Sequence, residues 1–180
     1  MSLMPTDLAD VIRSRLRAIP DYPKAGIIYQ DITPVLQDAV LFRQVVEALA
    51  EPFLDSRVTH VIGIEARGFI LGGAVATHLG AGFVPARKAG KLPWKTRSES
   101  YSLEYGEDSL EAHEDAFHHD DSRVLIVDDV IATGGTARAT GSLVRSLGAS
   151  VVGWAFLLGL EELAGHKLLE GAPNHTLVTV

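Results

Sequence analysis

Apolar residues alternate between helical and extended spacing along the chain, and this alternation predicts an α/β fold. A first helical stripe, which Asp7 is placed to cap and Pro20 to end, consists of Leu8, Val11, Ile12, Leu16 and Ile19. Further helices are predicted over residues 42–53, 68–80, 140–147 and 161–169. Strands are predicted over residues 58–64, 82–86, 123–127 and 151–158. Strands that alternate with helices favour a mainly parallel central sheet flanked by helices, with ligands beyond the carboxyl ends of the strands.

Residues 88–106 interrupt this pattern. The segment is polar, contains Gly90, Pro93 and Gly106, and shows apolar spacing only in a β-like stretch at 101–105. It predicts a long loop, and long loops in compact domains are often functional lids. We therefore expect a flexible loop over roughly residues 91–106.

Composition narrows the class of protein. A chain of 180 residues favours a single domain over residues 1–180. Its net charge of -7 argues against nucleic acid or a membrane surface as a partner. Without cysteine, disulfides and thiolate chemistry are excluded. No signal peptide and no apolar run near the ~20 residues of a membrane span is visible, so we expect a cytoplasmic protein.

The strongest local signal lies at residues 124–136, where a buried strand runs into two acids, a turn of small residues and a helix. Glycines let backbone N–H groups approach an anion, and the helix N-terminus points its dipole at the same place. A monophosphate site is therefore predicted on Ala132, Thr133, Gly134, Gly135 and Thr136. Asp128 and Asp129 suit ribose hydroxyls or a hydrated cation. The glycines are not followed by the Lys of a Walker loop, and G-x-G-x-x-G is absent.

This segment resembles the phosphoribosyl pyrophosphate signature of type I phosphoribosyltransferases, and a resemblance to the adenine-specific family extends over about residues 19–153. The resemblance implies the type I fold, with a small N-terminal hood from roughly residues 1–35 and a flexible catalytic loop. It also implies a homodimer. Mg²⁺ would be the cofactor, carried by the sugar substrate near Asp128 and Asp129 and without a direct protein ligand.

Other segments take roles from the same resemblance. Ala66 and Arg67 match the pyrophosphate loop, together with the cations Arg87, Lys88 and Lys91, and Arg67 is also expected to take part in catalysis. The Tyr-Ser-Leu-Glu-Tyr-Gly run at 101–106 matches the catalytic loop. Glu104 stands at its general acid/base position, with Tyr105 beside it.

The same resemblance implies a base pocket formed by Ile28, Tyr29 and Leu157, with the Tyr29 ring stacked on the purine. Three features depart from the family pattern. Gln30 replaces a basic residue, Gly159 replaces a Glu, and residues 94–98 are atypical.

The implied reaction converts adenine and 5-phosphoribosyl 1-pyrophosphate into AMP and pyrophosphate. Three alternatives stay open: transfer to another base such as xanthine or hypoxanthine, a catalytically weak paralogue, and a regulator that binds phosphoribosyl pyrophosphate without catalysis. Metal binding by His113, His118 and His119 is disfavoured because their spacing is irregular.

Overall fold

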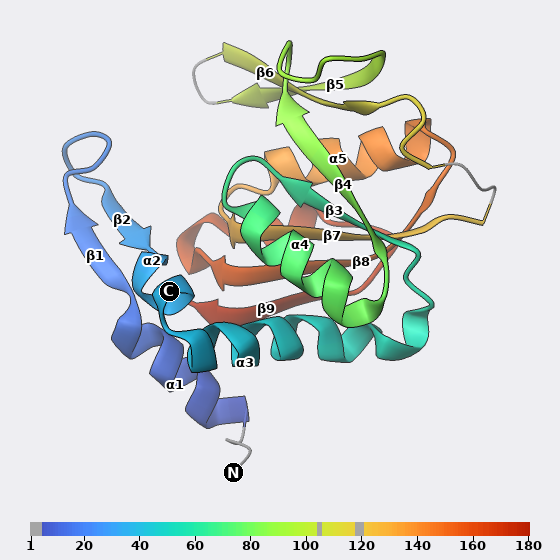
Figure 1. Ribbon diagram of the computed structural model, residues 1–180. Helices are drawn as coiled ribbons and strands as arrows, with labels where there is room; N and C mark the ends of the chain where they lie inside the picture. The colour runs from blue at the N-terminus through green and yellow to red at the C-terminus, as the bar shows by residue number, and fades with distance from the viewer. Residues whose placement is uncertain (1–4, 104–105, 118–120) are drawn as a thin grey trace.

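A central sheet with helices on both faces forms the body of the protein (Figure 1). The computed structural model describes residues 5–103, 106–117 and 121–180. The elements are α1 (Pro5–Arg15), β1 (Arg17–Pro20), β2 (Ile28–Asp31), α2 (Thr33–Gln37), α3 (Ala39–Ala50), η1 (Glu51–Ser56), β3 (His60–Ile64), α4 (Gly68–Leu79), β4 (Gly82–Lys88), β5 (Thr96–Leu103), β6 (Gly106–His113), β7 (Arg123–Ile131), α5 (Gly135–Ser146), β8 (Ser150–Gly159), η2 (Glu161–Leu163), η3 (Gly165–Leu168) and β9 (Asn174–Thr179).

The sheet has the strand order β5-β6-β4-β3-β7-β8-β9. The five neighbouring strands β4, β3, β7, β8 and β9 run parallel to one another. By contrast, β6 pairs antiparallel with both β4 and β5. This arrangement confirms the α/β class and the mainly parallel sheet. The helices predicted at 42–53, 68–80 and 140–147 correspond to α3 with η1, α4 and α5.

The central strands are buried on both faces, which explains their continuous apolar runs. Along β3 and β7, Val61 and Leu125 belong to the core cluster shared with α3 and α4. Their neighbours Ile62 and Ile126 belong to the cluster shared with α5. Helix α3 starts where the Asp38 carboxylate accepts hydrogen bonds from the Val40 and Leu41 amides, each 3.1 Å long, which is a regular N-cap.

Parallel pairing brings the carboxyl ends of three strands together at one edge. Ile64 at the end of β3 pairs with Ala86 of β4, and Gly63 pairs with Val127 of β7. Helices α4 and α5 begin just beyond this edge, at Gly68 and Gly135. The edge thus collects strand ends and helix N-termini, where α/β proteins bind ligands.

The N-terminal segment forms an arm beside the body, made of α1 and the β1–β2 hairpin (Figure 1). The prediction that the first helix continues through Ile19 is wrong. The helix ends at Arg15, and Ile19 pairs instead with Tyr29 in an antiparallel two-stranded sheet. Pro20 has no amide proton, so a short hairpin accommodates this segment better than a helix does.

Two other expectations need correction. The segment at 88–106 is not a loop throughout, because residues 96–103 form β5, which pairs along its length with β6. The segment 161–169 forms two 3₁₀ turns, η2 and η3, rather than a helix, and Ala164 between them has a positive φ of 46°. The strands β6 and β9 were not predicted.

Two helical glycines provide a test of the packing. A Cβ at Gly141 in α5 would lie 2.4 Å from the buried Trp154 ring, whereas a Cβ at Gly73 in α4 would meet nothing within 4 Å. We expect Gly141→Ala to lower the free energy of unfolding by about 2 kcal/mol through overpacking. Gly73→Ala should raise it by about 0.5–1 kcal/mol through helix propensity. Urea denaturation measures both, and a destabilisation of equal size in the two variants would contradict this packing.

Candidate active site

A cavity of about 440 Å³ opens at the edge where β3, β4 and β7 end. Its walls come from the end of β3 with the turn that follows, from Lys88 at the end of β4, from the β5–β6 hairpin, and from the segment between Asp128 and Ala137. Segments that lie far apart in the sequence therefore meet around one volume, which suits a ligand of nucleotide size.

Part of the cavity lining is the turn between β7 and α5 together with the first residues of α5, which we call the phosphate loop (residues 132–136). Gly134 adopts φ +82°, and a Cβ at this position would lie 2.3 Å from the Gly165 carbonyl oxygen. Both facts require glycine there. The loop leads directly into α5, whose first residue is Gly135. Free N–H groups and the positive end of the helix dipole therefore face the cavity, as an anion site requires.

Two adjacent carboxyl groups at the end of β7 have different environments. Asp129 is 4% exposed and forms an ion pair with Arg67. The Asp128 carboxylate accepts a hydrogen bond of 2.8 Å from the Asp129 amide, and a Cβ at Gly68 would lie 2.7 Å from its Oδ1. Burial, and then the charge of Asp129, raise the pKa of Asp128 well above its ordinary value. The pair therefore does not carry two full negative charges as readily as exposed carboxylates do.

Arg67 connects the body to the N-terminal arm. Besides its bond to Asp129, its guanidinium donates to the Tyr29 hydroxyl, and its Cζ lies 5.2 Å from the centroid of the Tyr29 ring. Tyr22 packs edge-on against Tyr29 with ring centroids 5.2 Å apart. The aromatic ring expected at the purine thus lies against a residue of the cavity wall.

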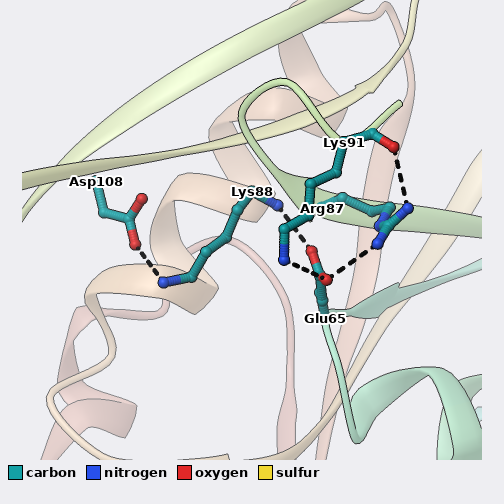
Figure 2. Close-up of polar contacts among 5 residues, drawn as sticks. All are labelled: Glu65, Arg87, Lys88, Lys91 and Asp108. Atoms are coloured by element: carbon teal, nitrogen blue, oxygen red, sulfur yellow. Dashed lines mark hydrogen bonds and ion pairs between the residues drawn. The ribbon is translucent and has the colours of Figure 1, made fainter. Parts of the chain in front are cut away.

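Glu65 gathers the cations at the end of β4 (Figure 2). Its carboxylate accepts hydrogen bonds from Arg87 Nη2 at 3.1 Å, Lys91 Nζ at 2.9 Å and the Lys88 amide at 3.1 Å. Desolvation alone would raise the pKa of Glu65, but the bonds from Lys91, Arg87 and the Lys88 amide outweigh it and lower the pKa to about 2. Glu65 is therefore an ionised anchor at neutral pH.

The β5–β6 hairpin contributes Asp108 and Tyr101 to the cavity lining. Asp108 Oδ2 lies 2.9 Å from Lys88 Nζ and accepts a 3.3 Å hydrogen bond from the Tyr101 hydroxyl (Figure 2 shows the Lys88 contact). The bond from Lys88 lowers the pKa of Asp108 despite desolvation. Burial raises the pKa of Tyr101, which acts against a Thr136 hydrogen bond that lowers it.

Most of the residues predicted for the sugar phosphate meet at the cavity. Its lining includes Ala66, Arg67, Lys88, Asp128, Asp129, Ala132, Thr133, Gly134 and Thr136. Gly135 begins α5 beside them, while Arg87 and Lys91 join the cluster through Glu65.

The residues predicted for the base are less closely grouped. Ile28 is 61% exposed on the arm, whereas Leu157 is fully buried in the core cluster that includes α3. The structure thus places Leu157 in the core rather than in the cavity lining. Glu104 and Tyr105 lie outside the described residues, so their catalytic roles stay predictions.

Sequence reasoning gave no role to Glu65, Tyr101 or Asp108. Tyr101 begins the run matched to the catalytic loop and Glu65 adjoins the pyrophosphate loop, but neither match singles out its side chain. Only the meeting of β3 with β4, and of β4 with β6, places them beside the cations. A signal for Asp108 did exist in the alternation of Asp108, Leu110 and Ala112, which predicts a strand with one face inward.

Within residues 5–103, 106–117 and 121–180, no group of three or more His, Asp or Glu side chains could hold a metal ion. His113 contacts the Trp94 ring edge-on, with centroids 6.2 Å apart, while His118 and His119 fall outside the described residues. No helix in this part of the chain is long and apolar enough to span a membrane.

Comparison with known proteins gives the same assignment throughout. The phosphoribosyl transferase domain family matches residues 36–169. An adenine phosphoribosyltransferase of Myxococcus xanthus is 53% identical over 178 residues, which are 99% of this chain and 96% of that protein. The crystal structure of adenine phosphoribosyltransferase from Rhodothermus marinus has a TM-score of 0.93 and 52% identity, covering 97% of this chain and 99% of that one.

A more distant relative is known with ligands. The adenine phosphoribosyltransferase of Saccharomyces cerevisiae, complexed with an imino-altritol bisphosphate and adenine, has a TM-score of 0.89 and 39% identity, covering 96% of this chain and 99% of that one. Fold, phosphate loop and domain match together define a phosphoribosyltransferase of type I. Within that class, the chain belongs to the adenine phosphoribosyltransferase family.

Glu65 makes a testable contribution to acid stability. A carboxyl group whose pKa is 4.5 when unfolded and about 2 when folded stabilises the native state above pH 4.5. This contribution is lost as the pH falls from about 4.5 to 2. We therefore expect the free energy of unfolding of the wild type to fall more steeply across that window than that of Glu65→Gln. Urea titrations at several pH values measure the difference, and parallel curves would contradict the anchor role.

Proposed function

We propose that this protein transfers the 5-phosphoribosyl group from 5-phosphoribosyl 1-pyrophosphate to adenine, giving AMP and pyrophosphate in purine salvage. The observation that carries the proposal is that one cavity joins a phosphate loop, an acidic pair and two cations. These are the groups that a sugar carrying a phosphate at one end and a diphosphate at the other requires. Family membership favours adenine as the acceptor.

In this proposal, the phosphate loop anchors the 5′-phosphate. Its hydrogen-bond donors are the backbone amides of residues 132–136 and the hydroxyls of Thr133 and Thr136. The positive end of the α5 dipole adds electrostatic attraction. Asp128 and Asp129 at the preceding strand end accept hydrogen bonds from the ribose hydroxyls. Held at both ends, the anomeric carbon is oriented for attack, and positioning of this kind supplies a large part of catalysis.

Departure of pyrophosphate leaves positive charge on the ribose ring. Arg67 and Lys88 line the cavity, with Arg87 and Lys91 behind them at Glu65, and their charges stabilise the leaving group. The carboxylates at the end of β7 would face the developing cation. Chemistry therefore rests on electrostatic complementarity to a charge-separated transition state rather than on a covalent intermediate.

The purine would lie between the arm and the cavity. The Tyr29 ring is held there by Arg67 and offers a face for stacking, while the Ile28 backbone offers hydrogen bonds to the edge of the base. Glu104 is proposed to handle the proton of the imidazole ring, with Tyr105 beside it. The role of Leu157 would be indirect, through packing beneath the pocket, since its side chain is fully buried.

Mg²⁺ fits this site as an ion that enters bound to the substrate phosphates. Mg²⁺ usually keeps several of its waters and binds substrate phosphates, and Asp128 and Asp129, next to the phosphate loop, would lie near the ion without ligating it directly. When bound, the ion would neutralise phosphate charge. The cytoplasmic location expected from the sequence stays a prediction.

The reaction is tested by offering phosphoribosyl pyrophosphate and Mg²⁺ with adenine, hypoxanthine, guanine, xanthine, uracil or orotate in separate assays. We expect nucleotide and pyrophosphate to form with adenine, because family membership favours adenine in the pocket beside Tyr29. Turnover of a different base would keep the phosphate chemistry and refute the assigned base pocket. Tight binding of phosphoribosyl pyrophosphate without turnover of any base would refute the proposed transferase activity.

Variants of the acidic pair separate the chemistry from the fold. Asp128→Asn with Asp129→Asn removes the charges that face the ribose, so kcat/KM for phosphoribosyl pyrophosphate should fall at least about 100-fold. Asp121→Asn is the matched control, because Asp121 is exposed just before the opposite end of β7. Equal activity in the double variant and the control would contradict the assigned role.

A homodimer is the proposed assembly, and it follows from family membership alone. Sedimentation equilibrium should give twice the mass of one chain. A mass near that of a single chain at micromolar concentration would contradict the dimer.

A further inference from the structure

The two cations that line the cavity among the described residues are both engaged by carboxylates. Arg67 pairs with Asp129, and Lys88 Nζ lies 2.9 Å from Asp108 Oδ2. The described lining carries four carboxyl groups, on Glu65, Asp108, Asp128 and Asp129. Carboxyl groups therefore outnumber cations in a site that must accept a polyanion.

Three of these carboxyl groups already have a structural role or a proposed binding role. Glu65 is shielded, with a side chain 12% exposed, and its three donors tie β3 to β4. Asp128 and Asp129 sit at the ribose end of the phosphate loop. Asp108 differs because it comes from the antiparallel hairpin and reaches Lys88, whose side chain is 57% exposed.

The position of Asp108 does not depend on Lys88. Its Oδ1 accepts a 2.9 Å hydrogen bond from the Ser109 amide, and its Oδ2 accepts one from Tyr101, which is 8% exposed. These neighbours would hold the carboxylate at the cavity wall after Lys88 has turned to another anion. The lowered pKa of Asp108 keeps it ionised at neutral pH.

We propose that Asp108 sets the affinity of the site for pyrophosphate, by competing with the diphosphate for Lys88 and repelling it once Lys88 is taken. The Asp108 carboxylate is an anion of the protein itself, and it lies beside the cation that is proposed to bind the leaving pyrophosphate. Bound pyrophosphate therefore has a built-in competitor, which favours its release after transfer. This inference rests on the proposed function, since it takes the anion at Lys88 to be pyrophosphate.

The variant Asp108→Asn tests the competition. An amide has nearly the same shape, and its oxygen still accepts from Ser109 or Tyr101, but it carries no charge. We expect the Kd of pyrophosphate, measured by calorimetry at fixed Mg²⁺, to fall about fivefold, which is the upper range for a single partly exposed ion pair. Product inhibition by pyrophosphate should strengthen by the same factor. Unchanged or weaker binding would overturn the proposal, because Asp108 would then only position Lys88.

Two comparisons separate competition at Lys88 from a change in net charge. Asp115→Asn removes the same charge from an exposed turn after β6, and its Kd should stay within about twofold of the wild type. In a Lys88→Met background, adding Asp108→Asn should tighten pyrophosphate binding less than it does in the wild type. An equal gain in both backgrounds would show general repulsion and overturn the competition for Lys88. Thermal denaturation confirms that each variant is folded.

The outcomes distinguish this inference from the proposed function. If the wild type forms AMP and Asp108→Asn binds pyrophosphate no more tightly, the inference alone fails. If the wild type binds neither pyrophosphate nor phosphoribosyl pyrophosphate, the proposed function fails, and the inference fails with it.

Discussion

Hydrogen bonding of β3 to both β4 and β7 in parallel register places three strand ends at one edge of the sheet. Each strand places different chemical groups there. Glu65 and Arg67 follow β3, cations stand at the end of β4, and β7 carries two acids followed by the phosphate loop. Opposite charges lie close together there because several of them form ion pairs between neighbouring strands or the turns that follow them, as in the bond between Arg67 and Asp129.

The same pairing makes the site a balanced network rather than a cationic patch. A protein with net charge -7 attracts a polyanion only through local arrangement. Glu65 holds Arg87 and Lys91 in place, and Asp108 engages Lys88. In the proposed complex, ligand binding would exchange one set of ion pairs for another, so the net gain would be smaller than the number of contacts suggests. For an enzyme that must release pyrophosphate, a moderate affinity is an advantage.

Sequence reasoning succeeded where one local stretch carries the whole signal. The run from Val124 to Thr136 contains strand, acids, glycines and helix start in order, and the structure places them in that order around the cavity. It failed where non-local pairing decides. Residues 96–103 are mostly polar and form a strand because β6 lies alongside, and residues 17–20 leave the helix because β2 pairs with them. Glu65 gained its role only from the approach of β4, which no local pattern records.

We propose that one cavity holds the sugar phosphate, with its 5′-phosphate on the phosphate loop and its pyrophosphate beside Arg67 and Lys88. A crystal structure of the protein with phosphoribosyl pyrophosphate, Mg²⁺ and a non-reactive adenine analogue tests it directly. The 5′-phosphate should lie on the amides of residues 132–136, the ribose hydroxyls at Asp128 and Asp129, and the pyrophosphate beside Arg67 and Lys88. A ligand bound in the reverse orientation, or outside this cavity, would contradict the account.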